Sequence, residues 1–284
     1  GAALLLAYAN GANDNFKGVA TLYGSRVLGY RRALAWATLT TLAGSMASLG
    51  LAGVLMARFS GKGLVPQAVT EDPRFLAAMA LGAAATVILA TFLGLPVSTT
   101  HALVGALAGA GWLAAGPDLD PRALGSNFFR PLVLGPLLAM TLTLGAYALL
   151  RAFRKKAGLK GSGCVCASWG PQVISLQASV ALQGGGLRIF QCPSHGDMAA
   201  EAVWGLDLRS VMDGLHVLSA GTVGFARGLN DTPKIASLLI LFPLVHPAAG
   251  FVLIAAVMAL GGLVHSRKLA ETLSHRITPM NPGQ

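Results

Sequence analysis

Residues 10–18 read NGANDNFKG and place amide, carboxylate and ammonium groups between two apolar runs. A charged side chain at membrane depth costs at least about 2.5 to 3.5 kcal/mol, so charges kept there indicate a functional site. The pattern returns as ARGLNDTPK at residues 226–234. An offset of 217 residues aligns the glycine, the Asn-Asp pair and the lysine of the two stretches. Two copies of a polar break predict two halves around one site.

The composition is typical of a polytopic membrane protein. Of the 284 residues, 54% are hydrophobic and only 11% are charged, and the apolar blocks are longer than a soluble core needs. Membrane spans of about 20 residues are expected at residues 33–57, 75–93, 101–115, 132–150, 211–225 continuing through 235–242, and 248–264. The net charge of +10 would also suit nucleic acid. The basic residues, however, lie in short loops beside the spans, where positive-inside topology explains them, so we expect no nucleic-acid partner.

The loop charges also predict the orientation of the two halves. Residues 24–32 form a short basic loop, and five positive charges fall within residues 151–160, so we expect both loops in the cytosol. Counting the membrane spans between these loops, we expect the first Asn-Asp segment to run from outside to inside and the second to run from inside to outside. We therefore expect a first transmembrane repeat at residues 1–150, a cytosolic linker at 151–207 and a second, truncated repeat at 208–284.

Two of the apolar runs are joined by GLPVSTTH at residues 94–101. Pro96 is expected to end the first helix, and Ser98 and Thr99 suit the N-cap of the second. The free N–H groups and the positive dipole end of that helix would then form an anion site. The sequence leaves open whether the pair crosses the membrane or enters it as a hairpin.

Each Asn-Asp motif carries groups that suit a cation, and the N-terminus of the half-helix that follows it suits an anion. A neighbouring glycine permits unwound backbone, which membrane depth tolerates where it lines a cavity. Exposed carbonyls, amides and carboxylates suit a hard cation, so Asn13, Asp14, Asn230 and Asp231 are the expected cation ligands. A polar contact between packed helices is the alternative for a single motif.

Lys17 and Lys234 each stand three residues after a motif aspartate. At this helical spacing the ammonium group can pair with the aspartate or lean toward an anion. The remaining alternative is that both side chains snorkel to the membrane interfaces.

The predicted linker carries three thiols and an imidazole, at Cys164, Cys166, Cys192 and His195. This is the ligand set of a closed structural zinc site, although the spacing is not a standard one. Free cytosolic thiols are the alternative. Alternating apolar runs in the same segment, such as residues 173–180, could pair as short strands.

Ser98 and His101 could suggest a hydrolase, but no G-x-S-x-G motif accompanies them. We therefore expect a protein that is not an enzyme and requires no cofactor.

Four features together resemble the inorganic phosphate transporter family, the sodium- or proton-coupled phosphate permeases. They are GAND at residues 11–14, PVSTTHALVG at 96–105, a basic central loop and a second G-x-N-D at 228–231. The resemblance implies an all-α polytopic fold of two inverted-topology repeats, with broken helices and re-entrant helical hairpins. Phosphate is then expected at the centre. The expected substrate-binding residues, with the two motif lysines included, are Asn13, Asp14, Lys17, Ser98, Thr99, Thr100, Asn230, Asp231 and Lys234.

The function implied by the resemblance is symport of inorganic phosphate with Na⁺ or H⁺ across the cytoplasmic (inner) membrane. Inorganic phosphate and the lipid bilayer are the expected partners, with a homodimer as a candidate assembly. A sulfate permease of the same fold stays open as an alternative. A passive anion channel and a non-transporting membrane scaffold are the alternatives from other classes.

The sequence departs from the family pattern in two places. The family usually has asparagine, in N-D-x-x-N, where Lys17 and Lys234 stand, so built-in ammonium groups could replace one or more sodium ions. The last residues, ITPMNPGQ at 277–284, resemble the approach to a second hairpin whose Ser-Thr-Thr tip is absent. The chain also begins inside an apolar run, so we expect a sequence truncated at both ends.

Overall fold

The computed structural model describes residues 1–50, 53–156, 164–168, 188–192, 204–206, 208–239 and 247–277. The chain divides into two compact units. Residues 1–145 and 217–282 form the first unit, and residues 146–216 form the second. All of the predicted site residues outside the cysteine-containing segment belong to the first unit.

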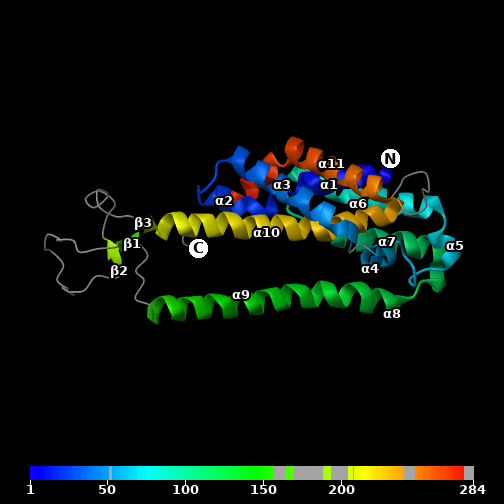
Figure 1. Cartoon of the computed structure of the whole chain (residues 1–284). Helices are drawn as coiled ribbons and strands as arrows, with labels where there is room; N and C mark the ends of the chain where they lie inside the picture. The colour runs from blue at the N-terminus through cyan, green and yellow to red at the C-terminus, as the bar shows by residue number, and fades with distance from the viewer. Residues whose placement is uncertain are drawn as a thin grey trace. The chain divides into compact units, whose positions relative to one another are not determined.

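The described part of the chain is mainly helical, as predicted (Figure 1). The α-helices are α1 Ala2–Asp14, α2 Ala20–Gly24, α3 Tyr30–Ala47, α4 Gly53–Phe59, α5 Gln67–Thr70, α6 Pro73–Leu93, α7 Thr99–Ala115, α8 Pro121–Leu124, α9 Arg130–Lys156, α10 Leu208–Ala236, α11 Pro247–His265 and α12 Arg267–Glu271. Short 3₁₀ segments lie at Lys17–Val19, Ser48–Gly50, Gly116–Asp118 and Ser237–Leu239, and π-helical turns at Gly125–Phe129 and Thr272–Arg276.

Among the described residues, three helical stretches are long and apolar enough to cross a membrane: Pro73–Leu93, Pro121–Phe153 and Ala248–His265. They coincide with the predicted spans at 75–93, 132–150 and 248–264. The predicted span at 33–57 instead falls on α3 and α4, between which residues 51–52 lie outside the description.

Glycines bring α1 and α11 into backbone contact. A Cβ atom at Gly11 would lie 1.8 Å from the carbonyl oxygen of Met258. A Cβ atom at Gly261 would lie 2.1 Å from the carbonyl oxygen of Tyr8. Only glycine permits so close an approach of two helix backbones.

The same crossing recurs between α10 and α3. A Cβ atom at Gly228 would lie 2.1 Å from the Thr41 carbonyl oxygen, and one at Gly44 would lie 1.9 Å from the Phe225 carbonyl oxygen. Each of these four residues lies 217 positions from its counterpart in the first crossing. The offset that aligns the two sequence motifs therefore also relates two helix pairs.

The unwound backbone that Gly11 and Gly228 were expected to permit does not lie at these two glycines. Helix α1 is regular as far as Asp14, and α10 is regular from Leu208 to Ala236, with Pro233 inside it. The physical reason is that both glycines serve close helix packing. The first helix ends at Asp14 and is interrupted at residues 15–16, before the 3₁₀ turn Lys17–Val19.

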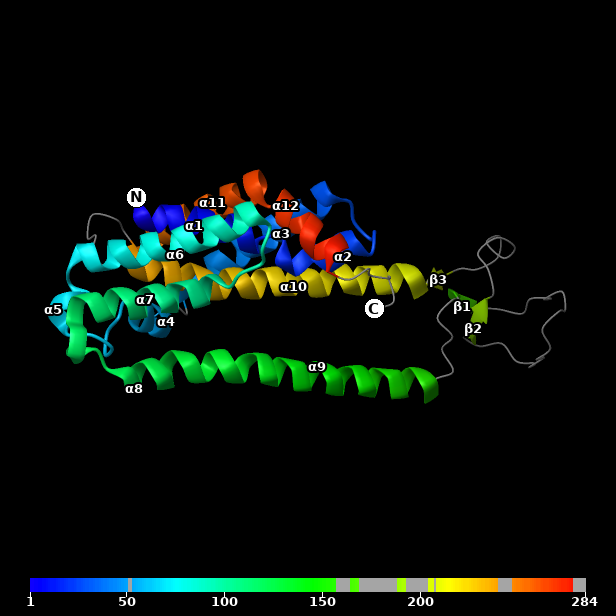
Figure 2. The same ribbon diagram turned by 180° about the vertical axis from the view of Figure 1, so that it is seen from behind.

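Helices α6 and α7 pack along each other and are joined by residues 94–98 (Figure 2). Helix α6 ends in Gly94, whose φ of 74° is the left-handed conformation that glycine adopts without strain. Ser98 is the N-cap of α7, as predicted, and its hydroxyl accepts a hydrogen bond from the His101 N–H at 3.3 Å. The chain thus turns sharply beside α1.

In the second unit, β1 Cys164–Ser168 pairs antiparallel with β2 Arg188–Cys192 and with β3 Trp204–Leu206. The strand order is β2-β1-β3. The predicted strand at residues 173–180 lies outside the described residues.

The apolar core of the first unit contains two clusters. One gathers around Leu6, Met79 and Leu103, and the other around Phe16 and Leu22. Residues 10–15 of α1 and its C-cap lie between these clusters along the chain and include buried asparagines and an aspartate. A polar layer is thereby enclosed between two apolar ones.

Candidate functional site

The two predicted motifs meet through one amide. The Asn10 side chain donates to Asp14 Oδ2 at 2.9 Å and to Asp231 Oδ2 at 3.2 Å. All three side chains are buried. Carboxylates that lie 217 residues apart in the chain therefore share the two N–H hydrogens of one amide group.

Both lysines pair with the aspartate of their own motif. Lys17 Nζ contacts Asp14 Oδ1 and donates to the carbonyl oxygen of Val97. Lys234 Nζ lies 3.5 Å from Asp231 Oδ1. The pairing with the motif aspartate, one of the placements considered from the sequence, is therefore present at both lysines.

The tip of the α6–α7 hairpin supplies hydroxyl groups to this cluster. Thr99 Oγ1 donates to Asp14 Oδ2 at 2.8 Å, and Thr100 Oγ1 accepts from Lys234 Nζ at 2.7 Å. Ser98 differs, because it is exposed and occupied by its capping bond. It lines a cavity of about 650 Å³ with His101 rather than the aspartate cluster.

Asn13 holds the hairpin against α1. Its amide donates to Thr91 Oγ1 at 2.9 Å and to the Leu95 carbonyl at 3.1 Å, and its oxygen accepts from the Val97 N–H at 3.1 Å. The aligned Asn230 is exposed and donates to Asp231 Oδ1 at 3.4 Å. Residues that the offset aligns therefore have different roles.

Sequence reasoning assigned no role to Asn10 or Arg227. Arg227 Nη2 donates to Asn10 Oδ1 at 3.0 Å, and its Nε lies 3.6 Å from Asp231 Oδ2. The signal was present, because each residue precedes its motif aspartate by four positions and so shares its helix face. The offset of 217 also aligns Asn10 with Arg227, but an amide and a guanidinium do not count as a sequence match.

Among the described residues, the formal charges of this cluster leave one positive charge in excess, since Lys17, Arg227 and Lys234 face two carboxylates. Charges removed from water are costly unless they are compensated. A further anion beside the cluster would complete the compensation. Hydroxyl and N–H donors around the carboxylates could orient the oxygens of such an anion.

The candidate zinc ligands are only partly described. Cys164 and Cys192 stand opposite each other in the antiparallel register of β1 and β2, whereas His195 lies outside the described residues. No group of three or more metal-ligating side chains occurs within the part of the chain that the structure describes.

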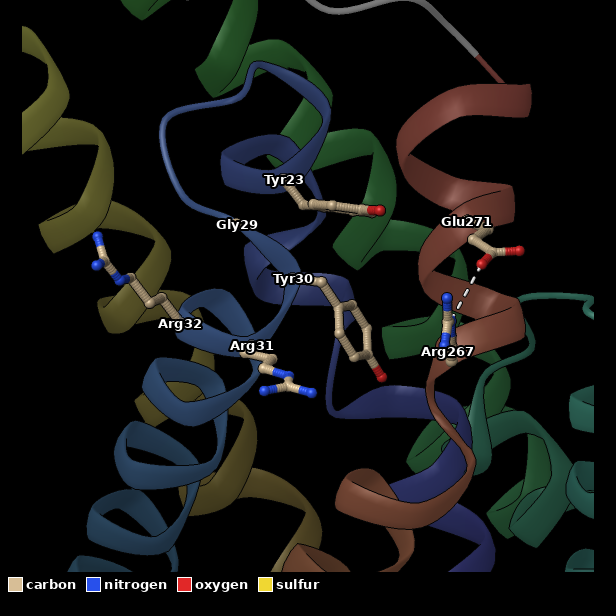
Figure 3. A pocket seen from close by; sticks show the side chains of 7 residues that line it. All are labelled: Tyr23, Gly29, Tyr30, Arg31, Arg32, Arg267 and Glu271. Carbon is tan, nitrogen blue, oxygen red and sulfur yellow. Dashed lines mark hydrogen bonds and ion pairs between the residues drawn. The ribbon is translucent and has the colours of Figure 1, made fainter.

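A further cavity of about 560 Å³ lies between α2, α3 and α12 (Figure 3). Its lining residues are Tyr23, Gly29, Tyr30, Arg31, Arg32, Arg267 and Glu271. Arg267 Nε lies 3.4 Å from Glu271 Oε1, as the dashed line marks. None of the predicted site residues lines this cavity.

Buried charged side chains within apolar helices, beside a helical hairpin, indicate a polytopic helical membrane protein. The profile of the phosphate transporter family matches residues 10–284. The chain therefore belongs to the phosphate transporter family.

Curated relatives carry corresponding names. A "Probable low-affinity inorganic phosphate transporter" of Streptomyces halstedii is 32% identical over 158 residues, which are 54% of this chain and 70% of that protein. The protein of the same name from Bacillus subtilis is 28% identical, over 55% of this chain and 46% of its own length. A "Sodium-dependent phosphate transporter" of Plasmodium falciparum is 32% identical, over 55% of this chain and 24% of that protein. The chain thus spans less than half the length of two of these relatives.

A solved structure titled "The sodium-dependent phosphate transporter" shares the fold. The TM-score is 0.63 at 17% sequence identity, and the match covers 99% of this chain and 78% of the other.

Proposed function

We propose that the protein takes up inorganic phosphate across the cytoplasmic membrane together with a coupling cation. The observation that carries the proposal is the joining of Asp14 and Asp231 by Asn10 in a cluster with one excess positive charge. The names of the relatives support phosphate as the substrate. The predicted substrate residues other than Ser98 lie in or directly beside this cluster.

We further propose that the membrane part consists of two inverted repeats, at residues 1–150 and 208–284, with a cytosolic linker at 151–207. Two observations support this arrangement. The loop charges place the two Asn-Asp segments in opposite directions. The matched crossings of α1 with α11 and of α10 with α3 are related by the same offset of 217 residues as the motifs.

Either Na⁺ or H⁺ would serve as the coupling cation. The names of two relatives in the comparisons include sodium dependence. The two lysines argue against a strong requirement for sodium, because their ammonium groups already neutralise the motif carboxylates. We therefore propose a weaker sodium dependence than an N-D-x-x-N sequence would give.

We also propose contact with lipid and, as a candidate assembly, a homodimer in the inner membrane. Helix α9 exposes large apolar side chains along its length, such as Leu137, Leu142 and Leu149. Apolar groups of this size are stable beside hydrocarbon and unfavourable in water.

Sulfate is the second candidate substrate, since its tetrahedral oxygens would meet the same donors. A protonated phosphate can donate a hydrogen bond to Asp14 or Asp231, whereas sulfate at neutral pH has no proton to donate. Competition of unlabelled sulfate with labelled phosphate uptake separates the two. Stronger inhibition by sulfate than by unlabelled phosphate would refute the assignment to phosphate.

The experiment that tests coupled transport is uptake by proteoliposomes that contain the full-length protein. Labelled phosphate should accumulate against its own gradient when a sodium or a proton gradient is applied. A channel would only equilibrate phosphate, and a scaffold would not move it. Absence of accumulation under both gradients would remove the symporter proposal.

A further inference from the structure

The guanidinium group of Arg227 is surrounded by oxygen atoms from three helices and the turn that follows α1. In addition to Asn10 Oδ1 and Asp231 Oδ2, it approaches Asn15 Oδ1 at 3.3 Å and Thr41 Oγ1 at 3.5 Å through Nη1. The Arg227 side chain is 12% exposed. We call these four acceptors, on Asn10, Asn15, Thr41 and Asp231, the oxygen cage.

The orientation of both amides in the oxygen cage is fixed by other bonds. Asn10 Nδ2 is used by the two motif aspartates. Asn15 Nδ2 donates to Thr38 Oγ1 at 2.9 Å. Each amide therefore directs its carbonyl oxygen at Arg227, because its nitrogen is committed elsewhere.

Two amide oxygens, a hydroxyl and a carboxylate are the ligand types of a hard cation. A guanidinium is a poor fit to four such ligands, because its donors lie in one plane. In agreement, Arg227 Nε is buried and has no hydrogen-bond partner among the described residues. The group supplies the charge that the oxygen cage requires without satisfying all of its own donors.

In the part of the chain that the structure describes, the corresponding positions of the other half do not form such a cage. The offset of 217 matches Asn15 to Thr232 and Thr41 to Met258. Thr232 Oγ1 is instead 2.7 Å from Ser45 Oγ and 3.8 Å from the Met258 sulfur. A thioether is a weak acceptor, so this corner offers little to a hard cation.

We propose that Arg227 is a resident cation that occupies a sodium position, so that this half of the site functions without a bound sodium ion. A neutral side chain at position 227 then opens the oxygen cage to Na⁺, which restores the net charge of the cluster. The consequence for coupling rests on the proposed transport function. Occupation of the oxygen cage by sodium does not depend on the transport function, because sodium binding can be measured without transport.

The test compares the full-length wild type with Arg227→Ala in detergent. Melting temperatures are measured in sodium chloride and in choline chloride at equal ionic strength. We expect Arg227→Ala to be stabilised by sodium beyond any effect on the wild type, by roughly 3 °C for each tenfold rise in concentration above the dissociation constant. An equal response of the two folded proteins to sodium would overturn the proposal.

Two further variants separate sodium binding from a purely structural role of Arg227. Arg227→Lys keeps the charge and should respond to sodium as the wild type does. Adding Thr41→Val to Arg227→Ala removes one ligand and should lower the sodium affinity about tenfold or more. Unchanged affinity would show that the ion binds elsewhere and would contradict the proposal.

Arg227→Ala could also unfold, because it removes the hydrogen bonds that join α10 to α1 and α3. In that case Arg227→Gln, which can still donate to Asn10, replaces it in the same comparison. If sodium restores the fold of either variant, the proposal is supported; if both stay unfolded in either salt, Arg227 is a structural tie and the proposal fails. A wild type without phosphate uptake would refute the transport function and leave the sodium result intact.

Discussion

The two Asn-Asp motifs match in sequence but bind different parts of the protein. Asn13, Asp14 and Lys17 all form bonds with residues 91–99 of the α6–α7 hairpin. In the second motif only Lys234 reaches the hairpin, through Thr100, while Asp231 is paired with Arg227 on its own helix. The first motif positions the hairpin, and the second one holds an additional charge. Sequence symmetry therefore specifies where the two motifs meet and not what each one does.

The largest effects are expected at the aspartates. Asp14→Asn and Asp231→Asn should both abolish coupled phosphate uptake, because each removes the carboxylate that balances buried cations. Asp231→Asn should destabilise more, since it removes the carboxylate that pairs with both Arg227 and Lys234, and breaking a buried pair costs about 3 to 5 kcal/mol. Uptake and thermal melting of both variants test this order. Exposed Asp118 supplies the control Asp118→Asn, and normal uptake by both site variants would refute the site.

Replacing both lysines with asparagine restores the N-D-x-x-N pattern in each half. The variant should lose uptake or become steeply sodium-dependent, because two fixed positive charges beside the carboxylates are gone. Phosphate uptake is measured over a sodium series at constant ionic strength. Wild-type uptake with unchanged ion dependence would place the lysines outside the transport function.

The asparagines give the sharpest contrast between the motifs. Asn13→Ala removes three hydrogen bonds between a fully buried side chain and the hairpin, and should lower the free energy of unfolding by about 2 to 3 kcal/mol. Asn230→Ala, at an exposed position, should change it by less than about 0.5 kcal/mol. Denaturation of the two variants side by side measures the difference. Equal losses would show that the motifs are equivalent after all.

Smaller effects on uptake than at the aspartates are expected at the hairpin tip. Thr99→Val removes one hydrogen bond to the charged Asp14, a loss of about 1.5 to 3 kcal/mol that should appear as a higher KM for phosphate. Ser98→Ala removes only the helix cap, about 1 kcal/mol of stability, and should leave KM unchanged. A larger KM effect for Ser98→Ala would reverse our placement of the two hydroxyls.

The sequence predicted the helical fold, several spans and the meeting of two distant motifs, because hydropathy and repetition are properties of the chain itself. It did not reveal the packing role of Gly11 and Gly228, since a glycine next to polar residues indicates unwinding and close packing equally well. Ser98 was assigned to the site because it carries a hydroxyl group like Thr99. In the structure the Thr99 hydroxyl contacts Asp14, whereas the Ser98 hydroxyl caps α7. Arg227 was missed because its role depends on oxygens from other helices, which no local pattern encodes.

The glycine crossings also limit how the protein can move. In each crossing a carbonyl oxygen occupies the space of a missing Cβ, so sliding one helix by a residue would drive a side chain into backbone. Helices α1 and α11 are therefore one rigid pair, and α3 and α10 another. Any rearrangement that opened the centre to one side and then the other would have to occur between these pairs. The boundary passes through the bonds of Asn10 with Arg227 and Asp231 and through the bonds of Asn15 with Thr38 and Arg227, so these two amides would change partners in such a rearrangement.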